Sequence, residues 1–107
     1  MKYKVMIVED QTMPRELFEL RVQASERFEL ALSIDNAALA DVYCLRFPVD
    51  LILMDVITRD GENGLDAAAR IKRAFPQIKI IIVTSMPECS YLKRAKEIGV
   101  ELSLIHI

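Results

Sequence analysis

The chain has 107 residues, of which 52% are hydrophobic and 28% charged, with a net charge of −2 at pH 7. This length corresponds to one domain, and the apolar content argues against a disordered chain. Lysine and arginine form no block that would mark direct nucleic-acid binding. The apolar runs are too short for a membrane span and no signal peptide is evident, so we expect a cytoplasmic protein without membrane contact.

The first half of the chain alternates between strand and helix patterns. Tyr3–Val8 is a β-type apolar run, and Pro14–Ser25 carries apolar residues at helical spacing. Phe28–Ile34 alternates as a strand does. Asp35 is a candidate N-cap for a second helix over Asn36–Phe47.

The second half repeats this alternation. Leu51–Met54 is nearly continuous in apolar residues, which is typical of a strand buried on both faces of a parallel sheet. A helix is predicted over Gly64–Phe75, a strand over Ile78–Val83 and a weaker helix over Pro87–Ile98. Leu102–Ile107 is a candidate fifth strand.

This alternation predicts βαβ units, hence a parallel sheet with helices on both faces. The expected fold class is α/β: a flavodoxin-like, doubly wound, parallel five-stranded sheet in the order 2-1-3-4-5, with no helix after the fifth strand. We expect Cys44 and Cys89 to be reduced thiols, because no metal-binding spacing connects them.

Oxygen-bearing side chains follow three of the predicted strands. Glu9 and Asp10 follow the first, Asp55 the third, and Thr84 and Ser85 the fourth. Ligands of open α/β sheets bind at the carboxyl ends of the strands, so these groups should converge there. Converging carboxylates repel one another, and Mg²⁺, which prefers oxygen ligands, would relieve that repulsion.

Each residue also has a purely structural interpretation. An aspartate at a strand end usually forms a turn or a cap, and a threonine there is usually present as a β-branched residue. Glu9 and Asp10 would equally suit a solvated turn. The joint arrangement favours function, because three strand ends each carry the atom type that phosphoryl transfer to a carboxylate requires.

Several segments together resemble the response-regulator receiver family, from about Lys4 to Glu101. The set in this order is specific, although no single segment would be. The segments are VMIVEDQ (Val5–Gln11), DLILMD (Asp50–Asp55), GLDAAARIK (Gly64–Lys72), IIIVTSM (Ile80–Met86) and EIGVE (Glu97–Glu101).

The resemblance implies a role for each residue at the strand ends. Asp55 matches the phospho-acceptor and is also expected to be a metal ligand. Glu9 and Asp10 match the acidic pair that holds Mg²⁺, with Asp10 the more direct ligand. Ile57 matches the position whose backbone carbonyl joins the metal shell, and Thr84 matches the switch hydroxyl. Such a domain is not a conventional enzyme: at most it catalyses its own phosphorylation and dephosphorylation.

The resemblance also implies partners. The phosphoryl donor would be a phosphohistidine on a histidine kinase that docks against the first helix, which makes Pro14–Val22 the candidate partner face. The sequence style is closest to regulators with a helix-turn-helix, DNA-binding output domain that controls transcription, and that domain is absent from this chain. We expect residues 1–107 to form one receiver domain whose sequence is truncated or altered after about residue 101.

Three departures from the family pattern raise an alternative. The loop Val56–Asn63 lacks the usual Met-Pro pair and has one extra residue. The family's lysine and switch aromatic fall on His106 and Ser103, and the chain ends where a fifth helix would begin. The alternative is a degenerate interaction module that no longer signals by phosphorylation.

A flavin or nucleotide binder is disfavoured, because no glycine-rich phosphate loop follows the first strand. We also expect the sheet face left by the missing helix to drive self-association.

Overall fold

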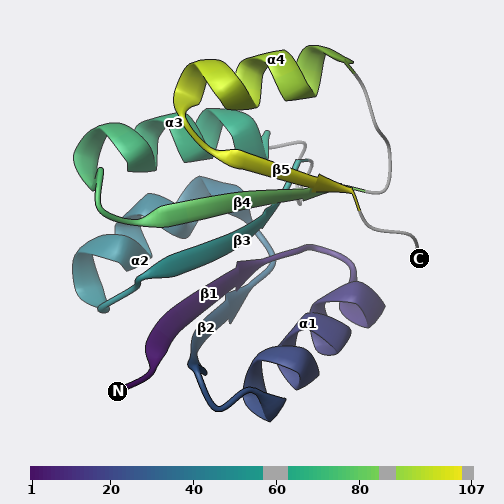
Figure 1. The fold of residues 1–107 in the computed structure, drawn as a ribbon, viewed down its shortest axis with the longest axis vertical. Helices are drawn as coiled ribbons and strands as arrows, with labels where there is room; N and C mark the ends of the chain where they lie inside the picture. The colour runs from purple at the N-terminus through teal and green to yellow at the C-terminus, as the bar shows by residue number, and fades with distance from the viewer. Residues whose placement is uncertain (57–62, 85–88, 105–107) are drawn as a thin grey trace.

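A computed structural model of the chain describes residues 1–56, 63–84 and 89–104. In these ranges, five strands alternate with four α-helices and one 3₁₀ turn (Figure 1). The elements in chain order are β1 (Tyr3–Val8), α1 (Thr12–Ala24), β2 (Phe28–Ile34), η1 (Ala37–Leu39), α2 (Ala40–Arg46), β3 (Leu51–Asp55), α3 (Gly64–Ala74), β4 (Lys79–Thr84), α4 (Cys89–Ile98) and β5 (Glu101–Leu104).

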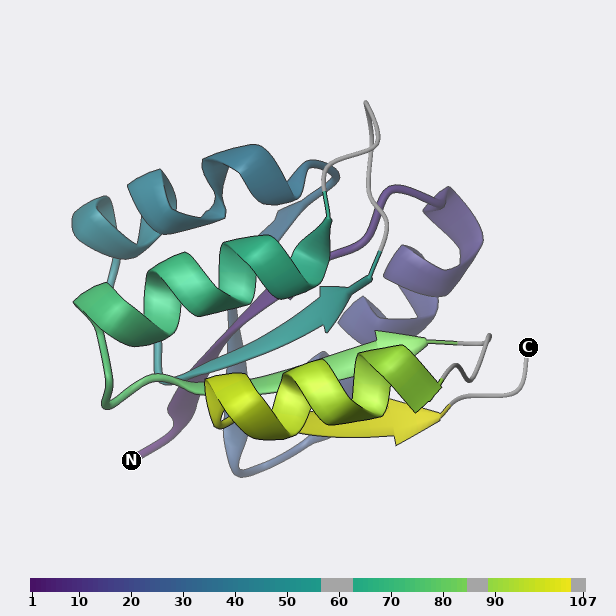
Figure 2. The same ribbon diagram turned by 90° about the horizontal axis from the view of Figure 1, so that it is seen from above.

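All neighbouring strands are parallel, and their order is β2-β1-β3-β4-β5. This confirms the predicted fold class and strand order. Figures 1 and 2 show α2, α3 and α4 on one face of the sheet and α1 on the other. Val8 at the end of β1 pairs with Met54, and Asp55 at the end of β3 pairs with Val83. The carboxyl ends of β1, β3 and β4 therefore lie side by side.

The main core lies between the sheet and α2, α3 and α4. Alternate residues of the central strands point into it, and their side chains are almost completely buried. Burying one large apolar side chain stabilises the fold by about 1.5–3 kcal/mol, so this layer contributes most of the hydrophobic stabilisation. The largest fully buried members are Met6, Ile52, Met54, Leu65, Ile71, Ile80 and Ile82.

A smaller core lies on the α1 face. Val5 and Ile7 of β1 are buried there against Val22 of α1, with Phe18 packed beside them. β1 is thus buried on both faces, because its alternate residues Met6 and Val8 belong to the main core. This double burial explains its continuous apolar sequence.

The starts of the first two helices differ from the prediction. The candidate cap at Asp35 is wrong: Asn36 is the N-cap, and its Oδ1 accepts a hydrogen bond from the Ala38 N–H at 2.9 Å. The segment begins as the 3₁₀ turn η1 before α2 forms. The first helix begins at Thr12, two residues earlier than predicted.

A glycine ends helix α4, and pairing with β4 defines the extent of strand β5. Gly99, with a φ of 89°, ends α4 in the left-handed conformation that glycine adopts without strain. β5 covers Glu101–Leu104 rather than starting at Leu102, and residues 105–107 lie outside the described part. No described helix is long and apolar enough to cross a membrane.

Candidate functional site

The structure brings three carboxylates together at the carboxyl edge of the sheet. Glu9 and Asp10 directly follow β1, and Asp55 is the last residue of the adjacent strand β3. Each side chain offers one oxygen such that all three lie within 4.8 Å of one another. The convergence predicted from the strand ends is therefore present for these three residues.

The other predicted site residues are placed less completely. Thr84 is the last residue of β4 and is buried, one position beyond Val83, the register partner of Asp55. Ser103 lies in β5 opposite Val83, with an exposed side chain. Ile57, Ser85 and His106 lie outside the described residues.

Glu9 is the most perturbed acid of the cluster. Its side chain is 5% exposed, and burial, followed by the negative charge of Asp55, raises the pKa of Glu9 from 4.5 to about 8. The Gln11 N–H donates to Glu9 Oε2 at 3.2 Å and opposes part of this rise in pKa. At neutral pH and without a cation, Glu9 is therefore mainly protonated, and its carboxyl shares a hydrogen bond with Asp55.

Backbone contacts position Asp55. The Val56 N–H donates to Asp55 Oδ1 at 2.9 Å. Gly64, the first residue of α3, packs directly against the backbone of Asp55. A Cβ added at Gly64 would lie 1.8 Å from the Asp55 carbonyl oxygen. The Gly64 N–H also donates to the Val56 carbonyl oxygen. Only glycine therefore lets α3 begin so close to the end of β3.

Sequence reasoning missed two supporting residues. Arg15 of α1 donates from Nη1 to the Glu9 carbonyl oxygen at 3.0 Å and so connects α1 to the site. Asn63 caps α3 by accepting from the N–H groups of Leu65 and Asp66 at 2.7 and 3.4 Å. An Asn before an apolar helical pattern is a usable N-cap signal, whereas nothing local in the sequence indicates the contact of Arg15.

The donor set fits Mg²⁺. All three side chains present hard carboxylate oxygens, and Mg²⁺ is commonly bound by one or two carboxylates together with water. Burial, followed by the negative charge of Asp55, raises the pKa of Glu9, so a further negative charge is unfavourable at this site. A divalent cation would neutralise that charge, so a metal fits the electrostatics as well as the donor chemistry.

The comparisons with known proteins identify the family of the chain. The sequence pattern of the response regulator receiver domain matches residues 5–105. The Fimbriae Z protein of Escherichia coli strain K12 is 30% identical over 95 residues, covering 89% of this chain and 45% of that protein. The oxygen regulatory protein NreC of Staphylococcus haemolyticus is 28% identical over 89 residues, covering 83% of this chain and 41% of that protein.

Solved structures show the same fold. A DNA-binding response regulator of the LuxR family from Staphylococcus aureus superimposes with a TM-score of 0.87 at 26% identity, over 95% of this chain and 85% of that one. A CheY-like receiver domain protein from Methanospirillum hungatei JF-1 gives 0.88 at 17% identity, over 100% of this chain and 84% of that one. The fold is that of an α/β receiver domain, and the chain belongs to the response regulator receiver domain family. It spans less than half the length of the curated relatives named above.

Proposed function

We propose that this receiver domain accepts a phosphoryl group on Asp55 in the presence of Mg²⁺. The observation that carries the proposal is the approach of the Glu9, Asp10 and Asp55 oxygens to within 4.8 Å of one another at the end of β3. Such a cluster combines a carboxylate nucleophile with two further acids that can hold a cation beside it.

The reaction uses the Asp55 carboxylate as the nucleophile. One of its oxygens forms a bond to phosphorus while the bond between phosphorus and the donor breaks, which leaves an acyl phosphate on Asp55. Glu9, Asp10 and Asp55 would hold Mg²⁺, together with the backbone carbonyl that the family resemblance expects at Ile57. When bound, Mg²⁺ offsets negative charge on the phosphoryl oxygens. The Thr84 hydroxyl donates a hydrogen bond to a phosphoryl oxygen and transmits the modification as the switch residue.

Glu9 has a second role before the cation binds. Its raised pKa means that at neutral pH the Glu9 carboxyl holds a proton beside Asp55. A cation held there would need a deprotonated Glu9 carboxylate, so this proton would leave Glu9 when the cation binds. The proton on Glu9 thereby keeps the metal-free site from carrying three adjacent negative charges.

We propose a histidine kinase as the donor and α1 as its docking helix, within Pro14–Val22. Leu17 and Leu20 in this segment, and Met13 just before it, are exposed at four- and three-residue steps, so they form an apolar stripe along one side of α1. A helical stripe of this kind is a common recognition surface. In a longer protein, the domain would control a DNA-binding output domain in the cytoplasm and so regulate transcription.

Acetyl phosphate provides the test. Incubation with acetyl phosphate and Mg²⁺ should add the mass of one phosphoryl group to the intact chain, and EDTA should prevent the addition. Asp55→Asn should abolish it, while Asp10→Ala should weaken Mg²⁺ binding measured by calorimetry. A gain that persists in Asp55→Asn would assign the phosphoryl group to another residue.

The alternative function is an interaction module that keeps the fold without phosphorylation. The observation that favours it is the exposed Ser103 in β5, at the position where the family resemblance expects a switch aromatic. A chain that binds Mg²⁺ at Asp10 but gains no phosphoryl group from acetyl phosphate would support this alternative.

A further inference from the structure

We propose that Arg15 of α1 is a positioning residue for the Mg²⁺ site and that it couples this site to the docking helix. The Arg15 guanidinium donates from Nη1 to the Glu9 carbonyl oxygen at 3.0 Å. The inference rests on the proposed function only in that Mg²⁺ binds at the acidic cluster, and it does not depend on phosphorylation.

Three residues, Glu9 to Gln11, connect β1 to α1, and they include two of the three acids of the cluster. The Glu9 N–H donates to the Ile34 carbonyl oxygen of β2 at 3.0 Å, so the sheet holds the amide side of this residue. Arg15 holds its carbonyl side. Because a peptide unit is planar, fixing the Glu9 carbonyl oxygen also restrains the Cα of Asp10, from which the Asp10 carboxylate projects.

Arg15 contacts the other end of this connection as well. Its backbone N–H donates to the Gln11 carbonyl oxygen at 3.1 Å, and the Gln11 N–H donates to Glu9 Oε2 at 3.2 Å. A single helix residue therefore holds both the first and the last residue of the connection. Displacement of the first turn of α1 would move the Glu9 carbonyl, and a cation that fixes Glu9 and Asp10 would in turn stabilise that first turn.

The size of the effect follows from what Mg²⁺ demands of its ligands, because this ion tolerates little departure from octahedral oxygen geometry. Residues that orient metal ligands without touching the metal typically contribute about 10- to 100-fold to metal affinity. The Arg15 side chain is only partly buried, so water replaces part of its bond to the Glu9 carbonyl when the side chain is shortened. We therefore expect the lower end of this range, about tenfold.

The charge of Arg15 and its hydrogen bond predict opposite effects on Mg²⁺ affinity. A positive charge near a cation site repels the cation, so removing a residue that acted only through its charge would tighten Mg²⁺ binding. Removing a residue that positions the ligands would weaken Mg²⁺ binding. The direction of the change in Kd therefore distinguishes the two roles.

Calorimetric titration of the 107-residue chain with Mg²⁺ measures this direction. Arg15→Met should raise the Kd about tenfold. The methionine fits without overpacking, because Arg15 borders a cavity of about 290 Å³ at the end of β2. Arg15→Lys, which keeps the positive charge and a donor group, should recover most of the affinity.

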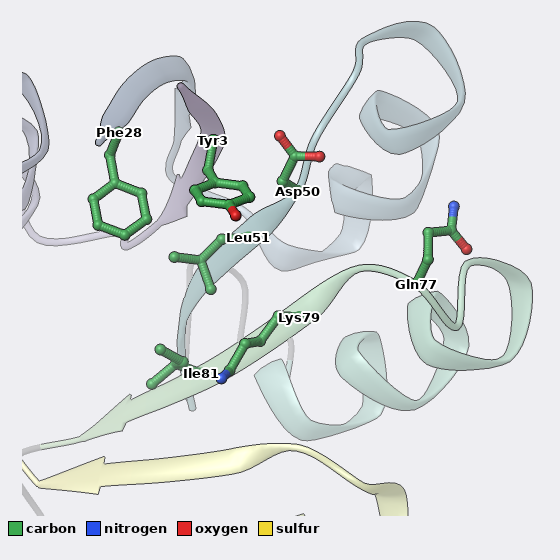
Figure 3. A pocket seen from close by; sticks show the side chains of 7 residues that line it. All are labelled: Tyr3, Phe28, Asp50, Leu51, Gln77, Lys79 and Ile81. Atoms are coloured by element: carbon green, nitrogen blue, oxygen red, sulfur yellow. The ribbon is translucent and has the colours of Figure 1, made fainter. Parts of the chain in front are cut away.

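Two controls remove a positive charge without touching the connection. Arg21→Met changes an exposed arginine of the same helix. Lys79→Met changes the lysine of the groove in Figure 3, which lies at the amino-terminal ends of the strands, opposite the acidic cluster. Both variants should bind Mg²⁺ as the original chain does, because salt screens charges that lie far from the site.

Hydrogen exchange followed by NMR gives a second measurement, in the original chain itself. Saturating Mg²⁺ should slow exchange of the Gln11 and Arg15 amides more than exchange of the Gly99 amide at the end of α4. In Arg15→Met this difference between the two regions should be lost.

Three results would overturn the inference and leave the proposed function intact. They are a folded Arg15→Met that binds Mg²⁺ at least as tightly as the original chain, equal weakening in Arg21→Met, and Mg²⁺ binding that slows the Gln11 and Arg15 amides no more than the Gly99 amide. Circular dichroism shows whether each variant is folded. An original chain that binds no Mg²⁺ would overturn both proposals, whereas a chain that binds Mg²⁺ but gains no phosphoryl group would contradict the proposed function alone.

Discussion

Replacing Glu9 with glutamine should stabilise the metal-free protein, increasingly so as the pH rises. The substitution keeps the shape of the side chain and an oxygen that can accept from the Gln11 N–H, but removes the carboxyl group that titrates. In EDTA, the ionised form of the Glu9 carboxyl destabilises the folded protein, because it is desolvated and lies beside Asp55.

The magnitude follows from the pKa. The Glu9 pKa is about 8 in the folded protein and near the ordinary glutamate value of 4.5 when the chain is unfolded. A folded pKa above the unfolded one means that stability is fully present below pH 4.5 and is lost as the pH rises to about 8. The ceiling of this loss is about 5 kcal/mol. Because the neighbouring Asp10 and Asp55 are only partly buried and water screens them, we expect about 1–3 kcal/mol.

Urea unfolding in EDTA at about pH 5, 7 and 9 measures this effect. The stability advantage of Glu9→Gln over the original chain should be small at pH 5, grow through pH 7 and level off above pH 8. Glu97→Gln, which removes an exposed acid from α4, is the matched control and should show no such trend. An advantage of equal size at all three pH values would refute the assigned burial and charge repulsion, as would a loss of stability throughout.

Three further predictions concern the site and the core. Gly64→Ala should lower the free energy of unfolding by about 2 kcal/mol or more and weaken Mg²⁺ binding in calorimetry, because its Cβ would collide with the Asp55 carbonyl. Gly99→Ala, which has open space around a residue of positive φ, should lower the free energy of unfolding by about 1 kcal/mol and leave Mg²⁺ binding unchanged. Equal Mg²⁺ affinities in the two variants would contradict this account. Mg²⁺ at ten times its Kd should raise the free energy of unfolding by about 1.4 kcal/mol, and an equal rise in Asp55→Asn would place the cation elsewhere. Burial, followed by the charge of Asp41, raises the pKa of Cys44 to about 11. Iodoacetamide should therefore label Cys44 about a hundredfold more slowly in the native protein than in urea. Similar labelling rates in the two states would show that this thiol is accessible.

The parallel sheet was predictable because apolar runs and helical spacing alternate along the chain, whereas the order of its strands was expected from the likeness to flavodoxin-like domains. Once parallel βαβ units are inferred, the carboxyl ends of the strands must meet at one edge. Asp55 and the Glu9–Asp10 pair directly follow apolar runs, so their convergence required no knowledge of side-chain packing. The 4.8 Å cluster is the outcome that this reasoning expects.

Other features depend on contacts that sequence patterns do not encode. Glu9 and Asp10 are adjacent, and nothing in their order shows that Glu9 is buried while Asp10 is only partly so. The close approach of Gly64 to Asp55 arises from how α3 meets the end of β3. Asp35 and Asn36 are both good capping residues, and the backbone path after β2 decides between them.

Locating the phosphoryl group on the chain tests the central claim most directly. After incubation with acetyl phosphate and Mg²⁺, sodium borohydride reduces an aspartyl phosphate to homoserine, which tandem mass spectrometry can assign to one position. We predict homoserine at position 55 and at no other aspartate, with none when EDTA is present. Homoserine at a different position, or none in a folded chain that binds Mg²⁺, would contradict the assignment of Asp55 as the phospho-acceptor.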